Sequence, residues 1–210
     1  MTDKADNQIT AFYPGAMDHA AALSLNSPAD FAVISPNNPQ AMVNFTLQCQ
    51  KNKIPYILDP GMQLPALSPE DLQNMIKGAE ILIGNDYEME LLSTKIQVPS
   101  TKLLEEVKIL ITTLGEKGSI IQTKEQTLQI NAGKVIQAVD PTGAGDAYRA
   151  GFLAGYSKNM DLKICGQMGS VAACYAVEIY GTTNHTFDLQ QFKQRYKDNF
   201  GEELNLESRD

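Results

Sequence analysis

The feature that most constrains the fold is the glycine-rich segment 140–152, which reads Asp-Pro-Thr-Gly-Ala-Gly-Asp-Ala-Tyr-Arg-Ala-Gly-Phe. Residues 135–139 before it are short, β-branched and alternating, which predicts a strand. Residues 147–156 after it contain no internal proline and are expected to form a helix. Small residues recur in that helix at i, i+4 and i+7, so we expect one helix face to lie close to a sheet. These residues are Ala147, Gly151 and Ala154.

The turn between the predicted strand and helix has the composition of an anion-binding site. Gly143, Ala144 and Gly145 carry little or no side chain. Several backbone N–H groups can therefore point at one spot, where the helix dipole adds partial positive charge. Asp146 lies in the first turn of the helix, and beside an anion it is placed to take a proton from an attacking hydroxyl. The simpler alternative is that Asp146 only interacts favourably with the helix dipole.

Residues 140–146 resemble the second signature of the PfkB (ribokinase-like) sugar and nucleoside kinases, in which Asp-Thr-x-Gly-Ala-Gly-Asp forms an anion hole and ends in the catalytic base. Pro141 stands where that signature often has Thr, and both aspartates are kept. The resemblance implies that the turn holds phosphoryl charge and that Asp146 is the general base. It also implies a monovalent cation, such as K⁺, near Asp140 and Thr142.

The resemblance extends along the chain but begins in the middle of the family's pattern. Residues 6–17 are similar to a central segment of bacterial PfkB-type adenosine kinases, which favours a nucleoside over a sugar as acceptor. The family's acidic sugar-binding position, Gly-Gly stretch and small β-sheet lid are not found, so roughly the N-terminal third of the pattern is expected to be absent. Because that part supplies inner strands, we expect exposed sheet edges and a homo-oligomer.

The predicted elements alternate between strands and helices, which is typical of an α/β protein with a parallel sheet. The resemblance implies one ribokinase-like domain over residues 1–210, a three-layer α/β/α sandwich with a mostly parallel central sheet. Strands are expected at 7–13, 30–34, 54–59, 81–84, 107–112, 119–122, 128–130 and 134–136, and helices at 39–51, 68–77, from 85 onward, 162–179 and 188–196.

A polar pair follows the predicted strand 81–84. Asn85 and Glu88 resemble the family's Asn-x-x-Glu motif, which orders Mg²⁺ and its waters around the phosphates. A hard divalent cation prefers oxygen ligands and keeps several waters, so a carboxylate in this position is chemically sensible. The alternative is structural, with Asn85 as an N-cap and Glu88 completing a capping box. The two roles are compatible.

The other site residues are implied by the resemblance more than by their own pattern. Thr-x-Gly-x-x-Gly at 113–118 resembles the family's nucleotide loop, although on its own it is only a hairpin turn. The turn after strand 30–34 corresponds to substrate contacts, and the loop after helix 162–179 lies near the adenine in the family. The residues concerned are Thr113, Gly115 and Gly118, then Ser35 and Asn37, and finally Asn184.

Composition narrows the class of partner. The formal net charge of −8 argues against a polyanion such as DNA or RNA. No run approaches the roughly 18 apolar residues of a membrane span, and residues 1–6 are unlike a signal peptide. Cys49, Cys165 and Cys174 match no metal spacing, and the last two are predicted to be buried thiols, which favours a reducing cytoplasm.

The leading hypothesis is an ATP- and Mg²⁺-dependent phosphotransferase, adenosine-kinase-like and acting in purine salvage. It would move the γ-phosphate to the 5′-hydroxyl of a nucleoside, with Asp146 as general base. One alternative is a catalytically impaired nucleotide-binding remnant of such a kinase, and another is a sugar kinase for ribose or fructose. A dinucleotide-binding protein has little support, since no Gly-x-Gly-x-x-Gly follows an early strand.

Overall fold

The computed structural model describes residues 12–206, and its centre is a sheet whose strands lie in sequence order. The first four strands are parallel, and the last two are antiparallel. The strands are β1 (Ala32–Ile34), β2 (Tyr56–Leu58), β3 (Ile81–Asn85), β4 (Ile109–Thr113), β5 (Ser119–Gln122) and β6 (Thr127–Ile130). The order confirms the predicted mostly parallel sheet, which ends in a β4–β5–β6 meander.

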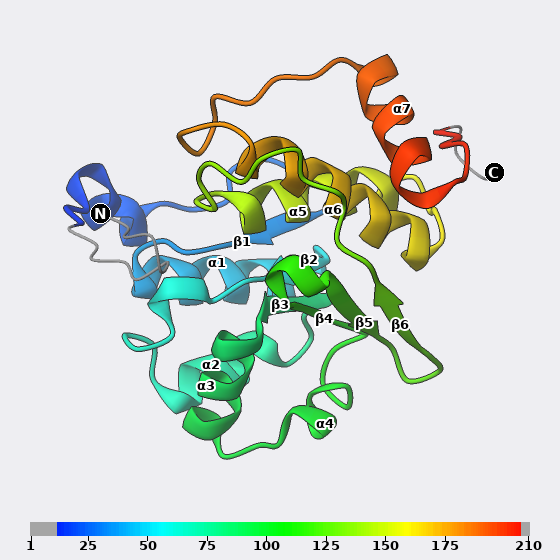
Figure 1. Cartoon of the computed structure of the whole chain (residues 1–210). Coiled ribbons are helices and arrows are strands. Elements are labelled where there is room, and N and C mark those ends of the chain that lie inside the picture. Colours follow the sequence, from blue (N-terminus) through cyan, green and yellow to red (C-terminus); the bar gives the residue numbers. More distant parts are fainter. Residues whose placement is uncertain (1–11, 207–210) are drawn as a thin grey trace.

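Helices cover both faces of the sheet, which gives the expected three layers (Figure 1). One face carries α1 (Pro39–Asn52), α2 (Pro69–Ile76), α3 (Asp86–Ile96) and the short α4 (Ser100–Leu103). The other face carries α5 (Ala144–Tyr156) and α6 (Leu162–Val177), with α7 (Leu189–Phe200) packed on α6. Three 3₁₀ segments complete the described chain: η1 (Gly15–Ala22), η2 (Gly61–Gln63) and η3 (Gly115–Lys117).

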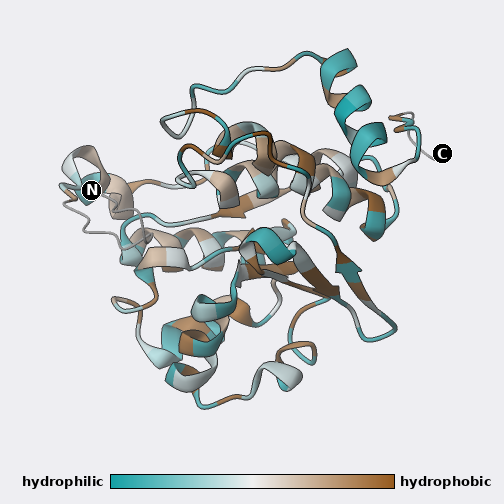
Figure 2. Cartoon of the chain, viewed as in Figure 1, coloured by the Kyte–Doolittle hydropathy of each residue, from teal (hydrophilic) through white to brown (hydrophobic). Residues whose placement is uncertain are grey.

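Alternating strand residues divide the core into two faces. In β3, Leu82 packs in the cluster with α1, α2 and α3, whereas Ile81 and Ile83 pack in the cluster with α5 and α6. All three side chains are almost fully buried, because a parallel sheet is covered on both sides. Figure 2 shows the resulting pattern: the central strands are hydrophobic, and α7 exposes a mostly hydrophilic surface.

The predicted helix starts are confirmed by their caps. Ser68 Oγ accepts the Asp71 N–H at 3.0 Å, and Pro69 is the first residue of α2. Asn38 caps α1 in the same way through the Ala41 N–H, again followed by a proline. A cap and a proline at the first position each favour helix initiation there.

The strand predicted at 135–139 is wrong, and so is the second arm of the hairpin at 134–136. Backbone N–H groups of this segment bind α6 and α7 instead of a strand. The Ile136 N–H donates to Glu178 Oε1 at 2.6 Å, and the Val139 N–H donates to the Val177 carbonyl at 2.9 Å. Since those donors are satisfied by helix ends, the apolar alternation of the segment does not make it a strand.

Two further expectations concern the packing of α5 and the strand at 7–13. The small face of α5 packs on α6 and not on the sheet: a Cβ on Gly151 would lie 2.5 Å from the Met168 carbonyl oxygen. Ala154 is exposed, and the α5 residues that reach the sheet cluster are the aromatic Tyr148 and Phe152. Of the strand predicted at 7–13, residues 7–11 lie outside the described residues, and residues 12–13 form no strand.

The cysteines are buried and free, as predicted for Cys165 and Cys174. Burial raises the pKa of the Cys165 thiol to about 12, so this side chain is an unreactive core group. Within residues 12–206 no helix is both long and apolar enough to cross a lipid bilayer.

Candidate active site

The candidate site lies at the carboxyl edge of the parallel strands. Ile34 pairs with Leu58, and Leu58 pairs with Leu82, so β1, β2 and β3 run in one direction with their carboxyl ends together. The Asp59 N–H donates to the Ile34 carbonyl at 2.8 Å, which joins the ends of β1 and β2. Ligands of parallel α/β proteins bind at such an edge.

Two predicted substrate residues follow β1 directly. Ser35 and Asn37 are both half-buried, and Asn37 Oδ1 accepts the Asn38 N–H at 2.7 Å. The structure therefore places them at the same sheet edge as Asp59. Their contact with a substrate remains a prediction.

The predicted anion-binding turn forms the start of α5. Gly143 is the N-cap, with φ of 88°, a left-handed conformation that favours glycine. The Ala144 N–H is used within the turn, donating to the Pro141 carbonyl at 3.1 Å. Helical geometry leaves the N–H groups of Gly145 and Asp146 without an acceptor inside the helix. Gly145 and Asp146 are both exposed, and a Cβ on Gly145 would meet nothing within 4 Å.

A loop from the C-terminal region closes over the other side of this turn. Asp140 Oδ1 accepts the Thr142 N–H at 3.0 Å, and Asp140 Oδ2 accepts the Gly181 N–H at 3.1 Å. These amides, Thr142 first, lower the pKa of the Asp140 carboxyl. A Cβ on Gly143 would lie 3.1 Å from the Thr182 carbonyl oxygen. Glycine is therefore needed at 143 both for its φ and for the approach of the loop.

Asn184 lies in that same loop, where it has a local structural role. Its Nδ2 donates to the Tyr180 carbonyl at 2.9 Å, and its side chain occupies the space beside Gly181. The loop is thus held to the turn by Asp140 and internally by Asn184. The role of Asn184 in nucleotide binding remains a prediction.

An arginine connects Asp146 to the end of β2. Arg149 Nη1 forms an ion pair with Asp59 Oδ2, and Arg149 Nη2 forms one with Asp146 Oδ1. The Arg149 and Asp59 side chains are 10% and 12% exposed, whereas that of Asp146 is 72% exposed. The contact fixes the first turn of α5 against the carboxyl edge of the sheet, so the Asp146 carboxylate and the N–H groups of Gly145 and Asp146 lie where a ligand of this fold class binds.

The buried Arg149–Asp59 pair lies beside the loop that follows β2. Burial lowers the pKa of Arg149, and the guanidinium stays charged because arginine is not deprotonated in proteins. Asp59 Oδ1 is buried and has no hydrogen-bond partner. A Cβ on Gly61 would lie 3.2 Å from that oxygen and 2.6 Å from Pro36 Cγ. Glycine at 61 therefore leaves room for Pro36 and for Asp59 Oδ1, which both lie close to it.

Asn85 and Glu88 adopt the structural alternative foreseen for them. Asn85 Oδ1 accepts the Glu88 N–H at 2.8 Å, and Glu88 Oε2 accepts the Asn85 N–H at 2.8 Å. This is a complete capping box at the start of α3. Glu88 keeps its second carboxylate oxygen, so the box is compatible with a water-mediated metal contact, and the Mg²⁺ role remains a prediction.

The predicted nucleotide loop is the β4–β5 connection. Thr113 ends β4, and the Leu114 N–H donates to the Gly118 carbonyl at 2.8 Å, which confirms the hairpin. A Cβ on Gly115 would meet nothing within 4 Å, whereas one on Gly118 would lie 1.9 Å from the Ile130 carbonyl oxygen. Gly118 is thus required by the packing of β6, and only Gly115 borders open space.

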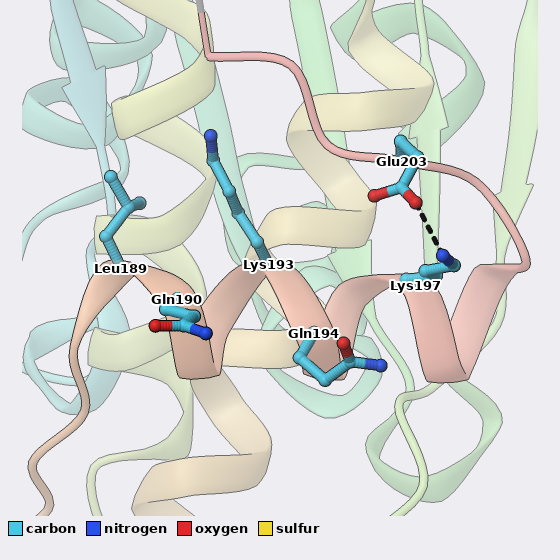
Figure 3. Close-up of a pocket in the computed structure, with 6 residues that line it drawn as sticks. All are labelled: Leu189, Gln190, Lys193, Gln194, Lys197 and Glu203. Carbon is cyan, nitrogen blue, oxygen red and sulfur yellow. Dashed lines mark hydrogen bonds and ion pairs between the residues drawn. The ribbon is translucent and has the colours of Figure 1, made fainter.

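The hollows found in the described part of the chain lie elsewhere on the molecule. One of about 420 Å³ lies along α7 and is lined by Leu189, Gln190, Lys193, Gln194, Lys197 and Glu203 (Figure 3). Its side chains come from α7 and the segment after it, with Lys197 Nζ 2.5 Å from Glu203 Oε1. None of the predicted site residues lines this hollow, which is a shallow polar groove without convergent chemistry.

Sequence reasoning missed Arg149 and Asp59. Both had signals: Asp59 ends a strand directly before Pro60 and Gly61, and Arg149 is the one cation in an α5 sequence of small and apolar residues. Arg149 also follows Asp146 by three positions, the spacing of an ion pair on one helix face. The partnership with Asp59 joins residues far apart in the sequence, and no local pattern indicates it.

Comparison with known proteins gives a consistent set of relatives. The family model described as pfkB family carbohydrate kinase matches residues 1–188. A nucleoside kinase of Methanocaldococcus jannaschii is 40% identical over 184 residues, which are 86% of this chain and 60% of that protein. The solved structure of a nucleoside kinase from that organism superposes with a TM-score of 0.86 at 35% identity, over 94% of this chain and 66% of that one.

A second relative has been solved with ligands. The nucleoside kinase of Burkholderia thailandensis in complex with inosine superposes with a TM-score of 0.90 at 31% identity, over 97% of this chain and 68% of that one. The same protein in complex with ADP-inosine superposes with a TM-score of 0.88 at 30% identity, over 94% and 63%. The three-layer fold expected from the sequence is therefore shared with these kinases, and this chain spans between 60% and 68% of their length.

Proposed function

The chain belongs to the pfkB family of carbohydrate kinases, with its ribokinase-like fold, and we propose that it transfers a phosphoryl group from ATP to the 5′-hydroxyl of a nucleoside. The relatives that support the acceptor are named nucleoside kinases, and one of them is solved with inosine. An adenosine-like purine nucleoside is the acceptor we favour, because residues 6–17 resemble adenosine kinases of this family. A role in purine salvage would follow.

The observation that carries the proposal is the position of the α5 start. The Arg149–Asp59 ion pair holds the start of α5, where Gly145 and Asp146 are exposed, at the carboxyl edge of the parallel sheet. Backbone amides at a helix N-terminus fit a phosphate, since they supply donors and partial positive charge. Asp146 stands beside them with an exposed carboxylate. An anion site and a proton acceptor are thus adjacent, as phosphoryl transfer to an alcohol requires.

The residues of the chain have separate tasks in this proposal. Asp146 accepts the proton of the attacking hydroxyl, through the carboxylate oxygen that Arg149 leaves free. Gly143 shapes the turn, and the amides of Gly145 and Asp146 stabilise negative charge that develops on phosphoryl oxygens. When bound, ATP supplies the γ-phosphoryl group and Mg²⁺ shields its charge. Glu88 would hold that metal through water, and Asp140 with Thr142 would border a K⁺ ion.

The decisive experiment compares this chain with Asp146→Asn in a nucleoside phosphorylation assay with ATP, Mg²⁺ and adenosine, inosine or ribose. We expect transfer to adenosine or inosine by the wild type, and a kcat lower by about 10²–10⁴-fold in the variant. ATP binding, measured by calorimetry, should survive the substitution. Turnover retained by Asp146→Asn would refute the general base. ATP binding without any transfer by the wild type would favour the nucleotide-binding remnant instead.

A further inference from the structure

We propose that Arg149 is a positioning residue for proton transfer, holding the carboxylate of Asp146 in place while Asp59 holds Arg149. The inference rests on the proposed function, because it assigns a task to Arg149 only if Asp146 takes up a proton. It extends that function to two residues outside the glycine-rich turn. In the structure Arg149 contacts both acids, Asp59 after the end of β2 and Asp146 in the first turn of α5.

The geometry of the guanidinium explains how one arginine can do this. Its two terminal nitrogens bind two different acids, Nη1 the Asp59 carboxylate and Nη2 the Asp146 carboxylate. A planar, rigid fork that is fixed at one nitrogen has its other nitrogen fixed as well. Asp59 is itself nearly buried, with a side chain 12% exposed, and its backbone N–H is bonded to the Ile34 carbonyl, so it lies at a fixed point of the sheet edge. The orientation of Asp146 is therefore set by the sheet and not by α5 alone.

Stability does not account for this arrangement. An ion pair whose partner is 72% exposed, as Asp146 is, contributes only about 0.2–1 kcal/mol. Burial of the arginine has a cost, visible in the lowered pKa of Arg149. A buried ion pair is often no more stable than apolar residues of similar volume. The fold would therefore lose little if both Arg149 and Asp59 were replaced by uncharged residues.

Catalysis does account for it. One oxygen of Asp146 is engaged by Arg149, and the other is left to receive the proton. A displacement of about 1 Å of a reacting group can lower a rate by about 10²-fold. A carboxylate on an exposed helix start rotates freely unless something holds it, and Arg149 is the side chain that does so here.

The test is Arg149→Met, which keeps the aliphatic stem and removes the fork. We expect kcat to fall about 10²-fold, with little change in KM for ATP or for the nucleoside. Arg149→Lys should recover part of the loss, and added guanidinium should raise the kcat of Arg149→Ala. The matched control is the Glu178→Gln/Arg195→Met double variant, which removes another buried arginine–carboxylate pair without leaving a buried charge and should leave kcat near the wild-type value.

Further arms keep the outcome decisive. If Arg149→Met does not fold because Asp59 is left buried and charged, the Asp59→Asn/Arg149→Met double variant replaces it and should fold but still turn over slowly. An unchanged kcat in a folded variant, or an equal loss in the folded Glu178→Gln/Arg195→Met control, would overturn the inference. A wild-type chain without any transfer would instead contradict the proposed function. In that case a crystal structure of Arg149→Met still decides: Asp146 in its original single rotamer would contradict a positioning role.

Discussion

Two buried arginines in this molecule make similar contacts and have different consequences. Arg149 and Arg195 have side chains that are 10% and 12% exposed, and each pairs with an acid that is nearly as buried, Asp59 and Glu178 respectively. Arg149 lies at the carboxyl edge of the sheet, whereas Arg195 belongs to α7 and reaches Glu178 at the end of α6.

Arg195 is surrounded by partners that belong to the folded core and its edges. Both oxygens of Glu178 accept from its guanidinium, and the Lys134 carbonyl accepts from Nη2 at 3.0 Å. Its Cζ also lies 4.5 Å from the centre of the Tyr175 ring, a cation–π geometry. Hydrogen bonding to Glu178 raises the pKa of Arg195. Every partner is structural, and together they join segment 134–136 to α6 and α7.

The surroundings of Arg149 are divided between the core and solvent. One nitrogen binds a buried acid and another binds Asp146, an exposed acid at the start of α5. Burial lowers the pKa of Arg149, the opposite direction from Arg195. A closed pair thus stabilises the fold, while an open one extends the rigidity of the core to a group at the surface.

The largest expected difference is in stability. Glu178→Gln should lower the free energy of unfolding by about 3–5 kcal/mol, because Arg195 is left buried without its counter-charge. Asp146→Asn removes the exposed partner of Arg149 and should cost less than about 1 kcal/mol. Urea unfolding followed by circular dichroism measures both. Glu202→Gln, from a pair with Lys163 that is about half exposed on both sides, is the control and should also have a small effect.

Glu178 also predicts a dependence of stability on pH. Hydrogen bonds from Arg195, the main cause, lower the pKa of Glu178 in the folded state. Its contribution to stability is therefore fully present above the unfolded pKa of about 4.3 and is lost as pH falls through the folded value. The wild type and Glu178→Gln should differ most at neutral pH and converge as pH falls from the unfolded value through the lower, folded value. A constant difference from pH 7 to pH 3 in urea titrations would contradict this assignment.

The sequence predicted those features of the fold and of the candidate site that depend on neighbouring residues. The glycine turn and Asp146 lie as expected at a helix start, because their conformations follow from residues that are adjacent in the chain. The starts of α1, α2 and α3 and the β4–β5 hairpin were predicted for the same reason.

The parts that depend on distant residues were not predictable. Segment 135–139 has the alternation of a strand, but Glu178 and Val177 occupy its backbone donors. The small face of α5 was expected on a sheet and lies on α6, since a pattern of glycines indicates a close approach without saying to what. Asp59 and Arg149 meet only through the fold. The candidate site could thus be located from the sequence, whereas the contacts that orient it could not.

The smallest expected effect concerns Asp140, an acid that is held without any arginine. Each of its oxygens accepts one backbone N–H, from Thr142 and from Gly181. Asp140→Asn leaves one acceptor oxygen, so one of these two amides should lose its bond, and Asp140→Ala should release both. Because the carboxylate lies at the surface, we expect faster hydrogen exchange at these amides with little change in global unfolding. Asn184→Ala, which removes a bond within the same loop, is the control and should leave exchange at Thr142 unaltered. If Asp140→Ala instead unfolded the protein as readily as Glu178→Gln, exposed acids would stabilise this fold as strongly as buried pairs do, and the distinction between closed and open pairs would fail.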